Sequence, residues 1–231
     1  MAHEVKSNRR AYHSPLRADQ AQQTRRRVLE SARRLFVEHG YAGTTVAAVA
    51  ADAGVSPETI YLSLGGKRGL LEGVMEITGP HDSATDDETR WHVVAGLPTA
   101  SQRLDSIIEY SCQILARTRP IHAIIRGAAD KEAFAAALGR HLLNERLANQ
   151  TDRIRRFLAD ELKPGLSIVE AGQRYCALTS PDLYHLLTVE LGWTADHHRY
   201  WLTDLLHTEL LGSARRPRTD RPRRQPGSRP R

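Results

Sequence analysis

Apolar residues recur every three to four positions along most of the chain, a spacing typical of amphipathic α-helices. In residues 20–39, Val28, Ala32 and Phe36 share one face, and Gly40 is placed to end the helix. No stretch alternates apolar and polar residues as a half-buried strand would, and no Asn-Gly or Asp-Gly pair suggests a hairpin. The pattern therefore predicts an all-α protein without an internal repeat.

Capping and turn residues divide this pattern into separate helices. Ser56 is a typical N-cap, and Pro57 stands at a first helical position, where a missing N–H is tolerated. Further helices are predicted at 46–52, 57–64, from 67 onward, and at 102–118, 120–128, 131–162, 167–178, 181–191 and 195–211. Residues 80–100 contain many Gly, Pro, Asp and Ser residues and are interpreted as a linker between two domains.

The helices at 46–52 and 57–64 are joined by the short turn Ala53-Gly54-Val55 and preceded by a longer helix. This order is typical of a helix-turn-helix, whose second short helix enters the major groove of DNA and presents its N-terminal residues to base edges. Helical hairpins are common, so patterning alone also allows an ordinary helical core.

A long ordered set of residues covers Thr24–Val74. Its members are Arg25, Ala32-x-x-Leu35-Phe36-x-x-x-Gly40, Thr44-Thr45-Val46-x-x-Val49-Ala50-x-x-Ala53-Gly54-Val55-Ser56, Thr59-x-Tyr61 and Lys67-x-x-Leu70-Leu71. This set resembles the DNA-binding domain of the TetR family of bacterial transcriptional regulators. The sequence departs from the family's common pattern where Leu62-Ser63-Leu64 replaces an aromatic-His-Phe run, Glu58 a frequent glycine and Gly66 a frequent serine. Weaker similarity to the C-terminal halves of such regulators extends through Ala177-Leu178-Thr179-Ser180-Pro181-Asp182-x-Tyr184, Glu190-x-Gly192-Trp193 and Trp201-Leu202.

The resemblance implies a ligand-responsive repressor whose three-helix N-terminal helix-turn-helix domain binds double-stranded DNA at a palindromic operator. The residues expected to contact DNA are Arg25, Arg26, Thr44, Thr45, Ser56, Pro57, Glu58, Thr59, Tyr61, Leu62, Ser63 and Lys67. Thr45, Tyr61 and Lys67 would contact phosphates, and the exposed third-helix residues would contact bases. An acidic residue such as Glu58 is also favoured in a first helical turn by the helix dipole alone.

The C-terminal helices are expected to form a domain for effector binding and dimerisation. Candidate residues for a small-molecule pocket are Trp91, Tyr110, Ile114, His122, Ile125, Arg126, Phe134, Leu138 and Tyr175. Candidate residues for a homodimer interface are Leu183, Leu186, Leu187, Leu191, Trp201, Leu202, Leu205 and Leu206, which could form a four-helix bundle with a second copy. The same apolar positions could instead belong to an ordinary intramolecular core.

The positive charge of the chain is concentrated at its two ends. The net charge of +6 combines +5 in residues 1–27, +7 in residues 213–231 and −6 in the body between them. We expect a disordered basic arm at 1–19, a DNA-binding domain at 20–79, an effector-binding and dimerisation domain at 101–212 and a disordered Arg/Pro-rich tail at 213–231. Because both ends are basic, a protein that coats DNA without sequence preference is one alternative function. A regulator that acts through protein contacts is a second alternative.

Composition excludes several other classes. With two cysteines the chain has neither a disulfide framework nor a four-cysteine zinc site. Motifs of zinc hydrolases, serine hydrolases and phosphate-binding glycine loops are absent from the sequence, so we expect no catalytic residues, no metal and no cofactor. No apolar stretch is long enough to span a membrane, and no secretory signal is recognisable. We therefore expect a cytoplasmic protein of the bacterial nucleoid.

Overall fold

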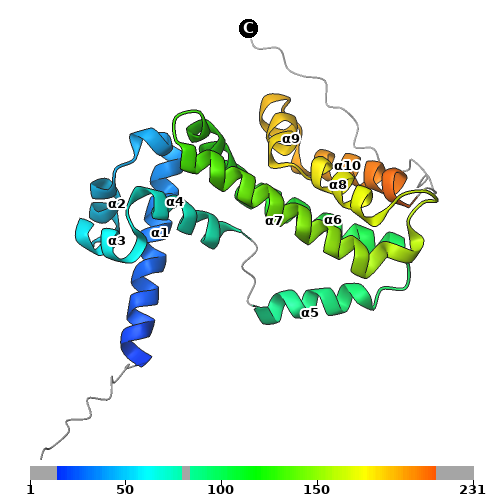
Figure 1. Cartoon of the computed structure of the whole chain (residues 1–231), viewed down its shortest axis with the longest axis horizontal. Helices are drawn as coiled ribbons and strands as arrows, with labels where there is room; N and C mark the ends of the chain where they lie inside the picture. Colours follow the sequence, from blue (N-terminus) through cyan, green and yellow to red (C-terminus); the bar gives the residue numbers. More distant parts are fainter. Residues whose placement is uncertain (1–14, 80–83, 212–231) are drawn as a thin grey trace, which may run out of the picture. The chain divides into compact units, whose positions relative to one another are not determined.

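In the computed structural model, residues 15–79 and 84–211 are described, and they form helices joined by short turns, with no strand among them (Figure 1). The helices are α1 Pro15–Gly43, α2 Val46–Ala53, α3 Pro57–Leu64, α4 Lys67–Thr78, α5 Ala84–Ala95, α6 Ala100–Ala129, α7 Ala133–Leu158, the 3-10 turn η1 Ala159–Glu161, α8 Ile168–Leu178, α9 Pro181–His185, the π-helical turn η2 Leu186–Glu190, and α10 Ala195–Leu210. The predicted all-α fold is confirmed. The predicted tail at 213–231 and most of the predicted arm at 1–19 lie outside the described residues.

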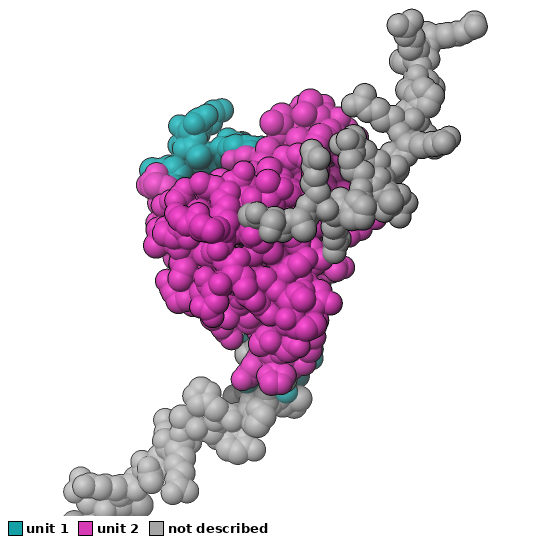
Figure 2. Space-filling model, turned by 90° about the vertical axis from the view of Figure 1, so that its right-hand side faces the viewer, with its two compact units in different colours: residues 1–79, 123–136 teal, residues 80–122, 137–231 magenta. Residues whose placement is uncertain are grey.

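The chain divides into two compact units, which Figure 2 distinguishes by colour. The first unit comprises Met1–Gly79 and Ala123–Ala136, and the second comprises Pro80–His122 and Ala137–Arg231. The division at residue 79 coincides with the predicted end of the DNA-binding domain. Residues 123–136 hold the end of α6, the α6–α7 turn and the start of α7, and they belong to the first unit rather than to the C-terminal domain that sequence analysis expected.

The first unit is built on α1, which packs against α2 and α4. Gly40 interrupts α1 with φ 70° and ψ 176°, as expected for the residue that ends its regular part. The buried apolar side chains of this unit include Val28, Leu29, Ala32, Phe36, Val49, Ile60, Leu70, Leu71 and Val74. They come from all four helices, so α2 and α3 are fixed to α1 and α4 by a common core.

The predicted linker at 80–100 is wrong for most of its length, because Ala84–Ala95 forms helix α5. Trp91 and Val94 on this helix are buried in the core of the second unit. Burial of an apolar face stabilises helices whose own sequence favours them little. The segment was predicted as a linker because its start is polar and rich in Asp.

Helix α6 also differs from the prediction, because it runs unbroken through Pro120 where two helices at 102–118 and 120–128 were expected. A proline inside a helix removes one backbone hydrogen bond. Ile121 and Ile125, which follow the proline, are both buried, and their packing offsets this loss. The long helix predicted at 131–162 is shorter than expected, because α7 begins at Ala133 and ends at Leu158, where η1 follows.

The core of the second unit contains an aromatic cluster centred on Trp91. The Trp91 ring meets Tyr110 edge-on at 5.3 Å between centroids and stacks on Phe157 at 5.7 Å. The Tyr175 hydroxyl, fully buried, is hydrogen-bonded to the Ser111 hydroxyl at 2.9 Å. Pairing of these two hydroxyls removes the cost of burying either one alone.

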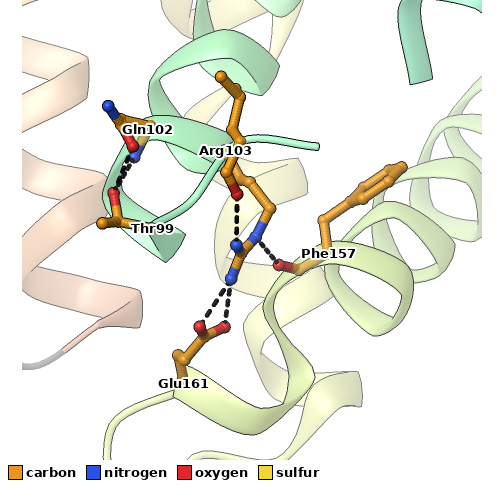
Figure 3. A network of polar contacts seen from close by, with 6 residues as sticks. Thr99, Gln102, Arg103, Phe157 and Glu161 are labelled. Atoms are coloured by element: carbon orange, nitrogen blue, oxygen red, sulfur yellow. Dashed lines mark hydrogen bonds and ion pairs between the residues drawn. The ribbon is translucent and has the colours of Figure 1, made fainter. Parts of the chain in front are cut away.

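Arg103 joins the start of α6 to the end of α7 through a set of polar contacts (Figure 3). Its guanidinium donates to the Phe157 carbonyl oxygen at 2.7 Å, to the Leu97 carbonyl oxygen at 2.9 Å and to the Glu161 carboxylate at 2.6 Å. Beside it, Thr99 caps α6 by accepting the Gln102 backbone N–H at 3.2 Å. Arg103 thereby satisfies two carbonyl groups at helix ends and turns, where no intrahelical donor is available.

His198 on α10 is a buried polar residue that sequence analysis did not single out. Its ring meets Tyr184 edge-on at 4.7 Å, and neither ring nitrogen has a hydrogen-bond partner among the described residues. Burial lowers the His198 pKa to about 4, so the imidazole is neutral at pH 7. The neighbouring His197 is exposed and stacks on Trp193. The adjacent histidines thus have different environments, and no group of three or more potential metal ligands lies in the described part of the chain.

Candidate nucleic-acid interface

Helices α2 and α3 form the helix-turn-helix at the positions that the sequence predicted. Thr45 caps α2 by accepting the Ala48 N–H at 3.1 Å, and Gly54 ends it in the left-handed region at φ 65°. Ser56 then caps α3 by accepting the Thr59 N–H at 3.3 Å. Ile60 is fully buried and attaches α3 to the rest of the unit. The opposite face of α3 is therefore free of intramolecular packing.

Glu58 and Leu62 lie one helical turn apart on this outer face of α3, and Thr59, Tyr61 and Ser63 flank them. Leu62 is 89% exposed, more than any other large apolar side chain in the described part of the chain. The face also contains the Glu58 carboxylate. The backbone N–H of Glu58 and the Ser56 hydroxyl hold the pKa of this carboxyl below its usual value. This lowered pKa is compatible with the helix-start role of Glu58 and with base contact, so both interpretations stay predictions.

Lys67 is the first residue of α4, whose N-cap Gly66 makes no side-chain capping bond. Its ammonium donates to the Ala42 carbonyl oxygen at 3.3 Å and lies 4.4 Å from the centre of the Tyr41 ring. Partial burial lowers the Lys67 pKa, and the nearby Glu132 charge opposes that shift. A positioned ammonium beside an uncapped helix N-terminus is a favourable place for a phosphate group.

The α6–α7 turn helps to position Lys67. Phe134 contacts the Tyr41 ring at 5.5 Å between centroids, and the Arg68 guanidinium lies 5.5 Å from the Phe134 ring centre. Tyr41 in turn stacks on Phe36 of the α1 core at 5.8 Å. Tyr41 was not among the predicted site residues. Its position as a large aromatic residue directly after the helix-ending Gly40 could have indicated a packing role.

Three of the predicted DNA contacts, Thr44, Arg25 and Arg26, have intramolecular partners in the structure. Thr44 is wrong as a DNA contact, because it is 1% exposed and its hydroxyl donates to the carbonyl oxygens of Leu35 at 3.0 Å and Gly40 at 2.9 Å. That hydroxyl closes the C-terminal end of α1. Arg25 and Arg26 form ion pairs with Glu76 at 2.8 Å and Glu30 at 3.0 Å. Exposed pairs of this kind are weak, so a phosphate can replace the carboxylate.

The predicted pocket residues do not form one group. Trp91, Tyr110 and Tyr175 are buried in the core of the second unit, where they contact other side chains of that core. Residues Ile125, Arg126 and Phe134 belong to the first unit, and Ile114, His122 and Leu138 are partly exposed in the second. The effector pocket therefore stays a prediction, and three of its aromatic candidates, Trp91, Tyr110 and Tyr175, are buried in the core of the second unit.

The predicted dimer interface also separates into two sets. Leu202 and Leu206 are 0% exposed and Leu187 is nearly so, which makes these three residues part of the second unit's interior and not of a surface. Leu186 and Leu191 are exposed, and Leu183, Trp201 and Leu205 are partly exposed. The reason is that one helix has an inner and an outer apolar stripe, and apolarity alone does not distinguish them.

Comparison with known proteins agrees with this geometry. Residues 28–74, which hold the helix-turn-helix and its supporting helices, match the sequence model described as bacterial regulatory proteins of the tetR family. No curated protein sequence in the comparison matches the chain. None of the helices in the described ranges is long and apolar enough to cross a membrane.

Solved structures share the fold at low sequence identity. NalD of Pseudomonas aeruginosa, the secondary repressor of the MexAB-OprM multidrug efflux pump, is 17% identical, with 83% of this chain and 98% of that chain covered at a TM-score of 0.63. SmeT in complex with triclosan is 17% identical, with 89% and 100% covered at a TM-score of 0.65. A transcriptional regulator of Saccharomonospora viridis in complex with choline is 19% identical, with 82% and 98% covered at a TM-score of 0.63.

The helix-turn-helix and its exposed third helix lie within the segment that matches bacterial regulatory proteins, so the N-terminal unit holds a DNA-binding domain of that kind. Residues 28–74 are thus similar to the tetR family of bacterial regulatory proteins, and these solved structures share the fold of the chain.

Proposed function

We propose that the protein is a homodimeric repressor that binds a palindromic operator and is released from it by a small-molecule effector. The observation that carries this proposal is the unpacked outer face of α3 beside Lys67 and the uncapped start of α4. That arrangement places side chains for base contact next to donors for phosphate contact. The similarity to NalD, which is described as a repressor, supports the repressor mode.

The similar structures support an effector without identifying it. SmeT was solved with triclosan and the Saccharomonospora viridis regulator with choline, two ligands of different chemistry. A ligand that binds one conformation of the protein better than the other would shift operator affinity, and couplings of roughly 1–3 kcal/mol change it about 5–150-fold. We propose this mode for the present chain.

The proposal is tested by selecting random-sequence duplexes on the purified protein at about 150 mM salt and sequencing those that are retained. A recovered palindrome supports a sequence-specific dimer and supplies an operator for effector screening by release. Enrichment without a motif would favour a protein that coats DNA non-specifically. Failure to retain any duplex would favour a regulator that acts through protein contacts.

We expect Lys67→Ala to weaken binding to all duplexes by about the same factor and to reduce the slope of log affinity against log salt by about one unit. The reason is that a phosphate contact releases a counterion but reads no base. Fluorescence anisotropy across a salt series measures both effects. The matched control is Lys131→Ala, an exposed lysine of the same unit, which should leave the slope unchanged.

Exposed apolar residues at η2 and α10 support a dimer at this end of the second unit. Leu186, Val189, Leu191 and Tyr200 are 46%, 48%, 59% and 50% exposed. Leu186 and Val189 lie on η2, Leu191 follows it, and Tyr200 lies on α10, which packs against η2. A two-fold symmetric interface would cover them with the same residues of a second copy.

Leu191→Glu is expected to raise the dimer dissociation constant by at least about 100-fold, because two unpaired carboxylates would be buried in a symmetric interface. Sedimentation equilibrium measures the constant. Leu143→Glu on α7, where the side chain is 48% exposed, is the matched control and should leave the dimer intact. A dimer that tolerates Leu191→Glu would place the interface elsewhere.

A further inference from the structure

Helix α3 lacks the side chains that usually read bases through paired hydrogen bonds. Pro57–Leu64 contains no Arg, Lys, Asn or Gln. Arg and Lys commonly read guanine in the major groove, and Asn and Gln commonly read adenine. If α3 lies in a major groove, its sequence preference must therefore come from other chemistry.

The two hydroxyls of Thr59 and Ser63 on α3 already make local hydrogen bonds. The Ser63 hydroxyl donates to the Thr59 carbonyl oxygen at 2.6 Å, and the Thr59 and Ser56 hydroxyls are hydrogen-bonded to each other at 3.2 Å. Thr59 and Ser63 would each have to give up or share such a hydrogen bond in order to read a base. Glu58 is exposed, and its own backbone N–H and the Ser56 hydroxyl hold its pKa below the usual value.

Leu62 is different, because it has no local contact to lose. It is 89% exposed, and the next most exposed large apolar side chain in the described ranges, Val93, is 61% exposed. The position of Leu62 on the face opposite the buried Ile60 makes it the most projecting apolar group of the helix. In the major groove, the apolar feature that distinguishes one base is the C5-methyl group of thymine.

We propose that Leu62 is the main specificity-determining residue of this protein and that it reads a thymine methyl group in each operator half-site. The inference rests on the proposed operator binding and adds to it the chemical group that is recognised.

The test uses the full-length protein and the selected operator, with each thymine replaced in turn by deoxyuridine. This change removes only the methyl group and keeps base pairing. We expect one thymine in each half-site whose replacement weakens binding about 4-fold, and about 15-fold when both half-sites are changed, since a buried methyl-sized group contributes about 0.8 kcal/mol. Leu62→Ala should cause a similar loss on the thymine operator and no further loss on the deoxyuridine operator.

Two controls separate this result from misfolding. Val37→Ala removes an exposed apolar side chain of the same unit and should leave binding to both operators unchanged. The unfolding midpoint of Leu62→Ala should equal that of the wild type, because the side chain is not packed. If a palindrome is selected but every deoxyuridine operator binds within 2-fold of the original, or if Leu62→Ala remains sensitive to the methyl group, the assignment to Leu62 is wrong while operator binding stands. If no duplex is retained, the proposed function and the assignment fail together.

Discussion

Gly69→Ala should destabilise the first unit by at least about 3 kcal/mol and abolish DNA binding. A Cβ atom at Gly69 would overlap the Leu64 carbonyl oxygen and would lie 2.7 Å from the carbonyl carbon. Both are backbone atoms, so no side-chain rotation can relieve the overlap. The end of α3 would have to move away from the start of α4, and with it the Lys67 site.

Denaturant unfolding followed by circular dichroism measures the loss, and anisotropy with the selected operator measures binding. The matched control is Gly127→Ala on α6, in the same unit, where a Cβ would meet no atom within 4 Å. That change should be neutral or stabilise the protein by about 0.4–1 kcal/mol, because it reduces the entropy of the unfolded chain. If Gly69→Ala unfolded at the same midpoint denaturant concentration as the wild type, α3 and α4 would not approach each other this closely.

Leu206→Ala should lower the free energy of unfolding by about 2–5 kcal/mol, the range found when a fully buried leucine is truncated in a core that relaxes only partly. Leu206 is fully buried together with Leu202 and Leu104 in the second unit. A core cavity destabilises the fold itself, so the loss should be the same at every protein concentration. Denaturant unfolding at two protein concentrations a hundredfold apart measures this directly.

Leu205→Ala is the matched control, because Leu205 is adjacent on α10 but partly exposed, and its truncation should cost about 1 kcal/mol or less. One result would contradict the assignment of Leu206 to the core of the second unit. If Leu206→Ala left the unfolding midpoint of the monomer unchanged but dissociated the dimer, Leu206 would belong to the interface that the sequence first indicated.

The helix-turn-helix could be predicted from the sequence, because each of its boundaries depends on local interactions. Thr45 and Ser56 cap helices through hydrogen bonds that span three residues, and Pro57 and Gly54 have backbone preferences of their own. The bounds of α2 and α3 therefore differ from the predicted ones by at most one residue. The outward position of Glu58 and Leu62 also follows from helical periodicity once Ile60 is taken as buried.

Contacts between distant residues decided what the sequence left open. Periodicity marks Leu186 and Leu202 equally as apolar, and only packing in three dimensions buries Leu202 and exposes Leu186. Likewise Thr44 and Thr45 are adjacent hydroxyls, but the end of α1 takes up Thr44 through the Leu35 carbonyl and leaves Thr45 exposed. Phe134, which was predicted for the effector pocket, contacts Tyr41, 93 residues earlier in the chain. Local signals fix where helices begin and end, whereas burial depends on neighbours that only the tertiary structure brings together.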